Sequence, residues 1–251
     1  MPWINKRRPQ AAIAAFVGLM LAGTAVAAPL VVRSAGPSAK TYPAGKAISD
    51  SAKIVLKAGD TVVLLDGRGT RTLSGPGTFS ATASATAAAT TGSTLNALVS
   101  GGGERRARIG AVRSASGIDK NAGTNPNVWY VDIGRSSNMC IADTSTVTVW
   151  RPGADKAATV TVTGPNGQGT IDLAAGQSAA LWPTNLPVID GGAYKLSWEG
   201  AKAPTALKFV VIKPTSPDLQ DMAQSLIKAG CNAQLDLLIK TVALPDGSPK
   251  G

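Results

Sequence analysis

The side chains that most often carry acid–base chemistry are scarce in this sequence. Its 251 residues include no histidine, two cysteines and only two glutamates, Glu104 and Glu199. Histidine is the usual proton-transfer group near neutral pH, so Ser-His-Asp and Cys-His hydrolases and His-ligated zinc enzymes are excluded. Two cysteines cannot build a four-thiolate zinc or iron–sulfur site. We therefore expect a protein that is not an enzyme and that uses no metal and no cofactor.

Two short patterns look like those of penicillin-recognising serine enzymes. Residues 225–228 match Ser-x-x-Lys, and residues 136–138 match Ser-x-Asn. Their order along the chain is the reverse of the order in those enzymes, and residues 240–242 (Lys-Thr-Val) lack the glycine of the third element. Matches of this length arise by chance, so we reject this interpretation. The aspartates form no sequence cluster that suggests a glycosidase pair or a calcium loop.

The N-terminus has the pattern of an export signal. Residues 6–8 are Lys-Arg-Arg, an apolar run follows from 11 to 22, and Ala25 and Ala27 form a small-x-small cleavage pattern. The apolar run is too short to span a bilayer, which needs ~20 residues. We predict a signal peptide over residues 1–27, cleavage after Ala27, and a periplasmic mature chain without a membrane-spanning segment.

The two cysteines, Cys140 and Cys231, are expected to pair. Disulfides form and persist in oxidising compartments such as the periplasm. A bond closing a loop of this length contributes at most about 4–5 kcal/mol in the chain-entropy estimate. The alternative is a reactive thiol, but no histidine exists to activate one. The sequence therefore predicts a structural disulfide.

Basic residues outnumber acidic ones, and several lie in one linker. The chain has 25 Lys and Arg against 15 Asp and Glu, and removal of the leader lowers the formal charge from +10 to +7. Outside the cytoplasm, anionic polysaccharide or lipid head groups are more natural partners than nucleic acid, although mildly basic surfaces also occur without a partner.

Residues 81–126 form an Ala/Thr/Gly/Arg-rich linker. Four of its residues could bind an anion through the paired N–H donors of their guanidinium groups, namely Arg105, Arg106, Arg108 and Arg113. A solvated connector is the simpler interpretation of this segment.

Residues 28–80 predict a small all-β domain. β-branched runs at 53–57, 61–65 and 70–73 are separated by turns that contain glycine. Asp66 and Gly67 suit a tight hairpin connection, and residues 75–77 (Gly-Pro-Gly) cannot continue a ladder.

The same residues resemble a known family. A Gly-Asp turn, an apolar strand, Leu65-Asp66-Gly67, a short polar strand and residues 73–77 (Leu-Ser-Gly-Pro-Gly) together resemble the FecR-type periplasmic domain over roughly residues 31–80. That family is named for a regulator that relays ferric-citrate signals across the inner membrane. The resemblance implies a repetitive β fold that acts by protein contact or ligand sensing. Only about ten residues precede the apolar run, so we expect no sigma-factor-binding segment.

Residues 127–214 predict a second β domain. About eight short strands separated by Gly- and Pro-containing turns match an immunoglobulin-like β-sandwich. Trp129, Trp150 and Trp198 lie within strand patterns and are expected in the core. Trp182 precedes Pro183 at a strand end and is therefore the candidate for stacking on a ligand.

Residues 215–251 predict a helical hairpin and tail. Ser216 and Pro217 suit a helix start, Gly230 a helix end, and a second helix runs through residues 235–242. Both helices are amphipathic, and we expect them to pack on the second β domain.

The sequence thus predicts a mainly β, exported, non-catalytic protein. Its expected role is ligand sensing with signal relay, or contact with an envelope or inner-membrane sensor protein. The alternative is a module that binds cell-wall or other polysaccharide through exposed aromatic rings, and a hydrolase is third.

Overall fold

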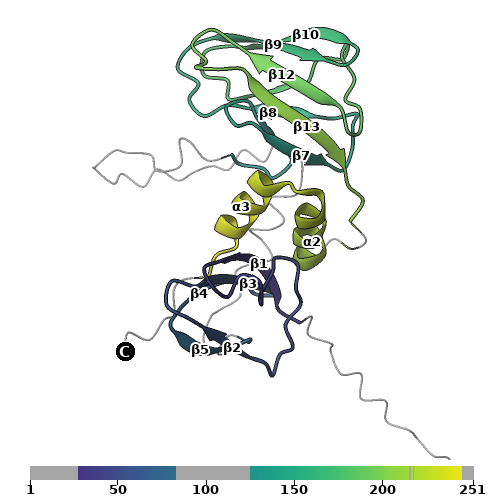
Figure 1. Ribbon diagram of the computed structural model, residues 1–251. Coiled ribbons are helices and arrows are strands. Elements are labelled where there is room, and N and C mark those ends of the chain that lie inside the picture. Colours follow the sequence, from purple (N-terminus) through teal and green to yellow (C-terminus); the bar gives the residue numbers. More distant parts are fainter. Residues whose placement is uncertain (1–27, 83–124, 215, 217, 245–251) are drawn as a thin grey trace, which may run out of the picture.

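The structure, a computed structural model, describes residues 28–82, 125–214, 216 and 218–244. It is mainly β with a pair of helices near the C-terminus, as predicted. Two β units lie at opposite ends of the molecule, and the two helices lie between them (Figure 1).

The first β unit contains a three-stranded sheet and a two-stranded ribbon. The sheet has the order β1-β3-β4, the ribbon pairs β2 with β5, and both are antiparallel. The strands are β1 (Leu30–Ala35), β2 (Lys53–Leu56), β3 (Thr61–Asp66), β4 (Gly69–Ser74) and β5 (Gly77–Ser80). Strands β2, β3 and β4 confirm the predicted runs, whereas β1 and β5 were not predicted. Their core consists of buried apolar side chains that include Val31, Ile54, Leu56, Val62 and Leu64.

Two aspartate side chains stabilise turns of this unit by accepting hydrogen bonds from backbone N–H groups. Asp66 lies opposite Gly69, so the centre of the hairpin turn is Gly67 and Arg68 rather than Asp66 and Gly67 as predicted. The Asp66 carboxylate accepts the Arg68 N–H at 2.8 Å. Asp60, 1% exposed, accepts the N–H groups of Ser38 and Lys57 at 2.7 and 2.6 Å. Burial alone would raise the pKa of Asp60, but these hydrogen bonds outweigh it and lower the pKa.

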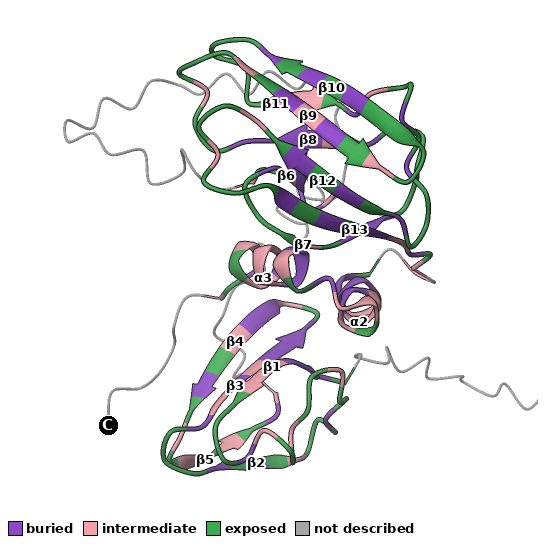
Figure 2. Cartoon of the chain, turned by 45° about the horizontal axis from the view of Figure 1, so that its top comes forward, coloured by how far each residue is buried: buried purple, intermediate pink, exposed green. Residues whose placement is uncertain are grey.

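The second β unit contains a five-stranded and a three-stranded sheet. Their orders are β10-β9-β12-β13-β7 and β11-β8-β6, with parallel pairing only at β13–β7 and β6–β8. The strands are β6 (Val131–Asp132), β7 (Ser137–Ile141), β8 (Thr148–Trp150), β9 (Ala158–Gly164), β10 (Gly167–Leu173), β11 (Ala179–Leu181), β12 (Ala193–Ser197) and β13 (Thr205–Val211). These strands confirm the prediction of about eight short strands in residues 127–214. Alternating buried and exposed residues appear as bands along β12 and β13 (Figure 2).

One apolar cluster fills the space between these two sheets. At its centre the rings of Trp182, Tyr194 and Phe209 meet edge to face, with centroids 5.3–5.4 Å apart. Trp182 is 7% exposed, and its indole N–H donates to the Leu186 carbonyl at 2.7 Å. The expectation that Trp182 presents a stacking face is therefore wrong, because the ring is a core side chain whose polar atom is satisfied internally.

The helices are α2 (Leu219–Ala229) and α3 (Asn232–Thr241). Gly230 ends α2 in the left-handed conformation, φ 70°, as predicted. The N-cap is Asp218, whose carboxylate accepts the Asp221 N–H at 2.8 Å, whereas Ser216 was expected to cap. The Ser216 hydroxyl donates to Asp218 instead. Within the described residues, neither helix is long and apolar enough to cross a bilayer.

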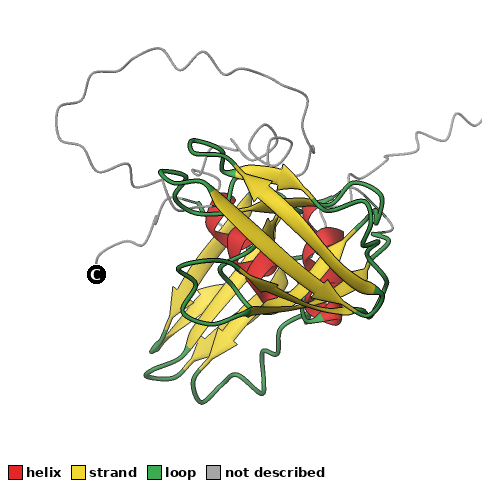
Figure 3. Cartoon of the chain, turned by 90° about the horizontal axis from the view of Figure 1, so that it is seen from above, coloured by secondary structure: helices red, strands yellow, loops and turns green. Residues whose placement is uncertain are grey.

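The helices pack against both β units rather than the second alone. Figure 1 shows them between the two units, and Figure 3 shows them beneath the strands of the second. We call their shared apolar contact the interface cluster; its buried members include Leu30, Val32 and Leu65 from the first unit, Val128, Cys140 and Ile212 from the second, and Leu219, Met222, Leu226, Leu235 and Leu238 from the helices. Each helix therefore buries apolar side chains against two partners at once.

The interface cluster predicts a large effect of truncating Leu226, which is fully buried. We expect Leu226→Ala to lower the free energy of unfolding by about 2–5 kcal/mol, because it removes buried methyl groups and leaves a cavity. Leu181→Ala is the matched control, since Leu181 is 71% exposed and should change stability by less than about 0.5 kcal/mol. Urea denaturation measures both; equal effects would contradict the packing described.

Candidate functional site

The start of α3 is bonded covalently to the edge of the second β unit. Cys140 on β7 and Cys231 at the N-cap of α3 are both fully buried and form a disulfide, with Cα atoms 5.9 Å apart. This confirms the predicted pairing. The bond closes a loop of 91 residues and fixes where α3 begins.

Gln234, one turn further along α3, completes the edge of β7. Its side-chain oxygen accepts the Cys140 N–H at 2.6 Å, and its amide nitrogen donates to the carbonyls of Cys140 and Val128, both at 2.8 Å. Gln234 is 4% exposed. β7 is an edge strand, whose outward backbone groups need partners when they are buried. The amide of Gln234 thus replaces a neighbouring strand at this position.

Asp236 connects α3 to both β units. Its carboxylate accepts Nη2 of Arg33, on β1, at 2.6 Å and Nη2 of Arg135, between β6 and β7, at 3.3 Å. Arg33 also donates to the side chain and carbonyl of Asn232 at 3.0 Å. These side chains are one-third to one-half exposed, so each ion pair contributes at most about 1 kcal/mol. Their main effect is to orient the two units.

The residues that follow α3 close the edge of the first sheet. Thr70 on β4 donates its N–H to the Val242 carbonyl at 2.9 Å and accepts the Leu244 N–H at 2.8 Å. A Cβ on Gly69 would overlap the Val242 carbonyl, so this close approach requires glycine. We use the term α3 junction for the disulfide, Gln234, the Asp236 ion pairs and this tail pairing.

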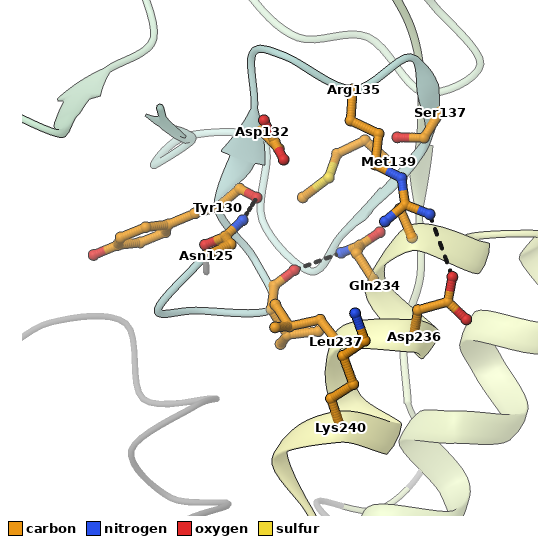
Figure 4. A pocket seen from close by; sticks show the side chains of 12 residues that line it. Asn125, Tyr130, Asp132, Arg135, Ser137, Met139, Gln234, Asp236, Leu237 and Lys240 are labelled. Atoms are coloured by element: carbon orange, nitrogen blue, oxygen red, sulfur yellow. Dashed lines mark hydrogen bonds and ion pairs between the residues drawn. The ribbon is translucent and has the colours of Figure 1, made fainter. Parts of the chain in front are cut away.

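A pocket of about 170 Å³ lies beside α3. Its walls come from β6, β7, the loop between them and one face of α3, as Figure 4 shows. Apolar side chains line part of it, namely those of Val128, Met139 and Leu237. Four charged residues also line it, namely Asp132, Arg135, Asp236 and Lys240, and the rest of the lining is mostly uncharged and polar: Asn125, Tyr130, Ser137, Ala233 and Gln234.

Within the described part of the chain, two of these charged side chains have a polar atom that makes no direct contact with a partner. Asp132 is partly buried and accepts the Gly134 N–H at 2.9 Å through Oδ1. Burial raises the pKa of this carboxyl, although the hydrogen bond and the charge of Arg135 oppose the rise. Among the described residues, neither Oδ2 of Asp132 nor Nζ of Lys240 has a hydrogen-bond or ion-pair partner. Figure 4 shows both side chains directed into the pocket.

The structure places the predicted site residues differently. The cysteines meet and Trp182 lies in the core, whereas Arg105, Arg106, Arg108 and Arg113 lie outside the described residues. The pocket and the other residues of the α3 junction were not predicted; Asp236, for example, meets its arginine partners across 100 to 200 residues of sequence. In the part of the chain that the structure describes, no group of three or more carboxylate or thiol side chains could hold a metal ion.

Comparison of the chain with protein-family models, curated proteins and solved structures finds no match. The function is therefore argued from the α3 junction and the pocket themselves.

The buried amide of Gln234 gives a test of the junction. We expect Gln234→Leu to lower the free energy of unfolding by at least about 2 kcal/mol, because three buried backbone groups lose their partner. Gln168→Leu, an exposed glutamine on β10, is the matched control and should change stability by less than about 0.5 kcal/mol. Thermal and urea denaturation measure both variants; a neutral Gln234→Leu would refute the edge-closing role.

Proposed function

We propose that this protein is exported to the periplasm and acts there without catalysis, in ligand sensing and signal relay or through contact with an envelope or inner-membrane sensor protein. The α3 junction is the observation that carries the proposal. It joins two β units in one defined orientation, and a protein that works by contact needs such a fixed surface. The signal-peptide pattern and the disulfide geometry both favour an oxidising compartment.

The two β units are interpreted at a finer level within the same proposal. The first is taken as a FecR-like domain, on the motifs of residues 31–80 and the short antiparallel strands that they form. The second is taken as an immunoglobulin-like sandwich, supported by two sheets that share one core. The parallel pairs β13–β7 and β6–β8 depart from a purely antiparallel sandwich.

The alternative function, polysaccharide binding, has less support. Its aromatic platform was expected at Trp182, which is buried. What remains in its favour is the positive charge of the chain, including the four arginines of the linker. We therefore rank it second.

Fractionation combined with crosslinking tests the proposal. The tagged chain should appear in the periplasm, begin at Ala28, and crosslink in envelope preparations to a membrane-embedded sensor protein. Asp236→Ala should reduce that crosslink because it releases both arginines. Asp155→Ala, at an exposed position away from the junction, should not.

Three outcomes would overturn the proposal. They are an uncleaved cytosolic protein, an envelope crosslink pattern without any membrane protein, and substrate turnover by the purified mature chain. Sedimentation of the protein with peptidoglycan or exopolysaccharide, in place of crosslinking, would favour the alternative function.

A further inference from the structure

The pocket beside α3 contains an incompletely compensated negative charge. Asp132 is partly buried at one wall of the pocket, and its Oδ1 accepts the Gly134 N–H. A carboxylate without a bonded cation in a partly dry site is unfavourable, and a cationic ligand group would relieve that cost. This wall therefore suits a ligand ammonium group.

The α3 side of the pocket supplies positive charge. Lys240 comes from the last turn of α3, and its ammonium group points into the pocket (Figure 4). Arg135 lies in the same turn as Asp132 and faces α3, where it forms an ion pair with Asp236, a carboxylate that it shares with Arg33. Two guanidinium groups on one carboxylate leave a net positive charge. This wall therefore suits a ligand carboxylate.

The size and the apolar part of the pocket limit the ligand further. A volume of about 170 Å³ is close to the ~150 Å³ of a cavity that accepts benzene, and so suits a ligand of about six to ten heavy atoms. Val128, Met139 and Leu237 also line the pocket and offer apolar contact. A short aliphatic side chain matches this surface.

We propose that the pocket binds an aliphatic α-amino acid, with its ammonium group at Asp132 and its carboxylate at Lys240 and Arg135. A simple anion would be repelled by Asp132, and a simple amine by Lys240 and Arg135. A zwitterion satisfies both walls at once. The proposal deepens the proposed function by naming the ligand class that a sensing protein would detect.

The position of the pocket gives such a ligand a structural consequence. Arg135 lines the pocket and also bonds Asp236, which holds Arg33 of the first β unit. A ligand carboxylate competes with Asp236 for Arg135. Ligand binding would therefore weaken the ion pair of Arg135 with Asp236, at the contact that orients the two units.

Calorimetry on the disulfide-bonded mature chain tests the ligand assignment. L-leucine and L-valine are the probes; 4-methylpentanoate, which lacks the ammonium group of leucine, and 3-methylbutylamine, which lacks its carboxylate, are the matched controls. We expect saturable binding of at least one amino acid at one site per chain, with each control weaker by at least about tenfold.

Two variants test the residues. Asp132→Asn keeps an acceptor for Gly134 but removes the charge, and Lys240→Met keeps the length of the side chain; each should weaken amino-acid binding by at least about tenfold. Asp155→Asn and Lys156→Met, at exposed positions that do not line the pocket, should bind as the natural protein does. Unchanged melting temperatures would show that the pocket variants are folded.

Specific results would overturn the assignment. If 4-methylpentanoate binds as tightly as leucine, the pocket is a carboxylate site and the role of Asp132 is wrong. If no amino acid binds up to about 10 mM, where even a millimolar Kd would be visible, the ligand class is wrong. Either result would leave the outcome of the fractionation and crosslinking experiments unchanged. Conversely, failure of the fractionation and crosslinking experiments would leave the measured amino-acid binding unchanged.

Discussion

The attachment of α3 to the edge of β7 is the constraint on which the rest of the structure depends. The disulfide fixes the first residue of α3, and Gln234 supplies the hydrogen bonds that a neighbouring strand would make. Because α3 starts there, its far end reaches β4, and the residues that follow it pair with the edge of the first sheet. The helix and the residues after it thus complete an edge in both β units, and their removal would expose both edges together.

The forces at this junction have different roles. Burial of leucine side chains in the interface cluster supplies most of the free energy, since each fully buried leucine contributes roughly 1.5–3 kcal/mol. The partly exposed pairs of Asp236 with Arg33 and Arg135 contribute much less. They are directional, however, and they connect the pocket wall to the contact between the units. Stability and orientation are therefore supplied by separate groups, so a ligand could affect orientation without unfolding the protein.

Local patterns in the sequence predicted the local structure. The β-branched runs between glycine-containing turns identified β2, β3 and β4, and Gly230 identified the end of α2, because such signals depend on neighbouring residues. The disulfide followed from having only two cysteines and an export signal. Gln234, Asp236 and the parallel pairing of β7 with β13 could not be predicted, since each depends on residues about 70 to 200 positions away. Trp182 was misinterpreted because Pro183 suggested a surface turn, whereas the Leu186 carbonyl binds the indole N–H inside the core.

Hydrogen exchange measured by mass spectrometry across a urea series tests most directly whether α3 joins the two β units into one cooperative body. The amides of β3 report on the first unit and those of β9 and β12 on the second. The account predicts that both sets lose protection at the same urea concentration, and that they separate in the Cys140→Ala, Cys231→Ala double variant. Loss of β3 protection at a clearly lower urea concentration in the natural, disulfide-bonded protein would contradict it.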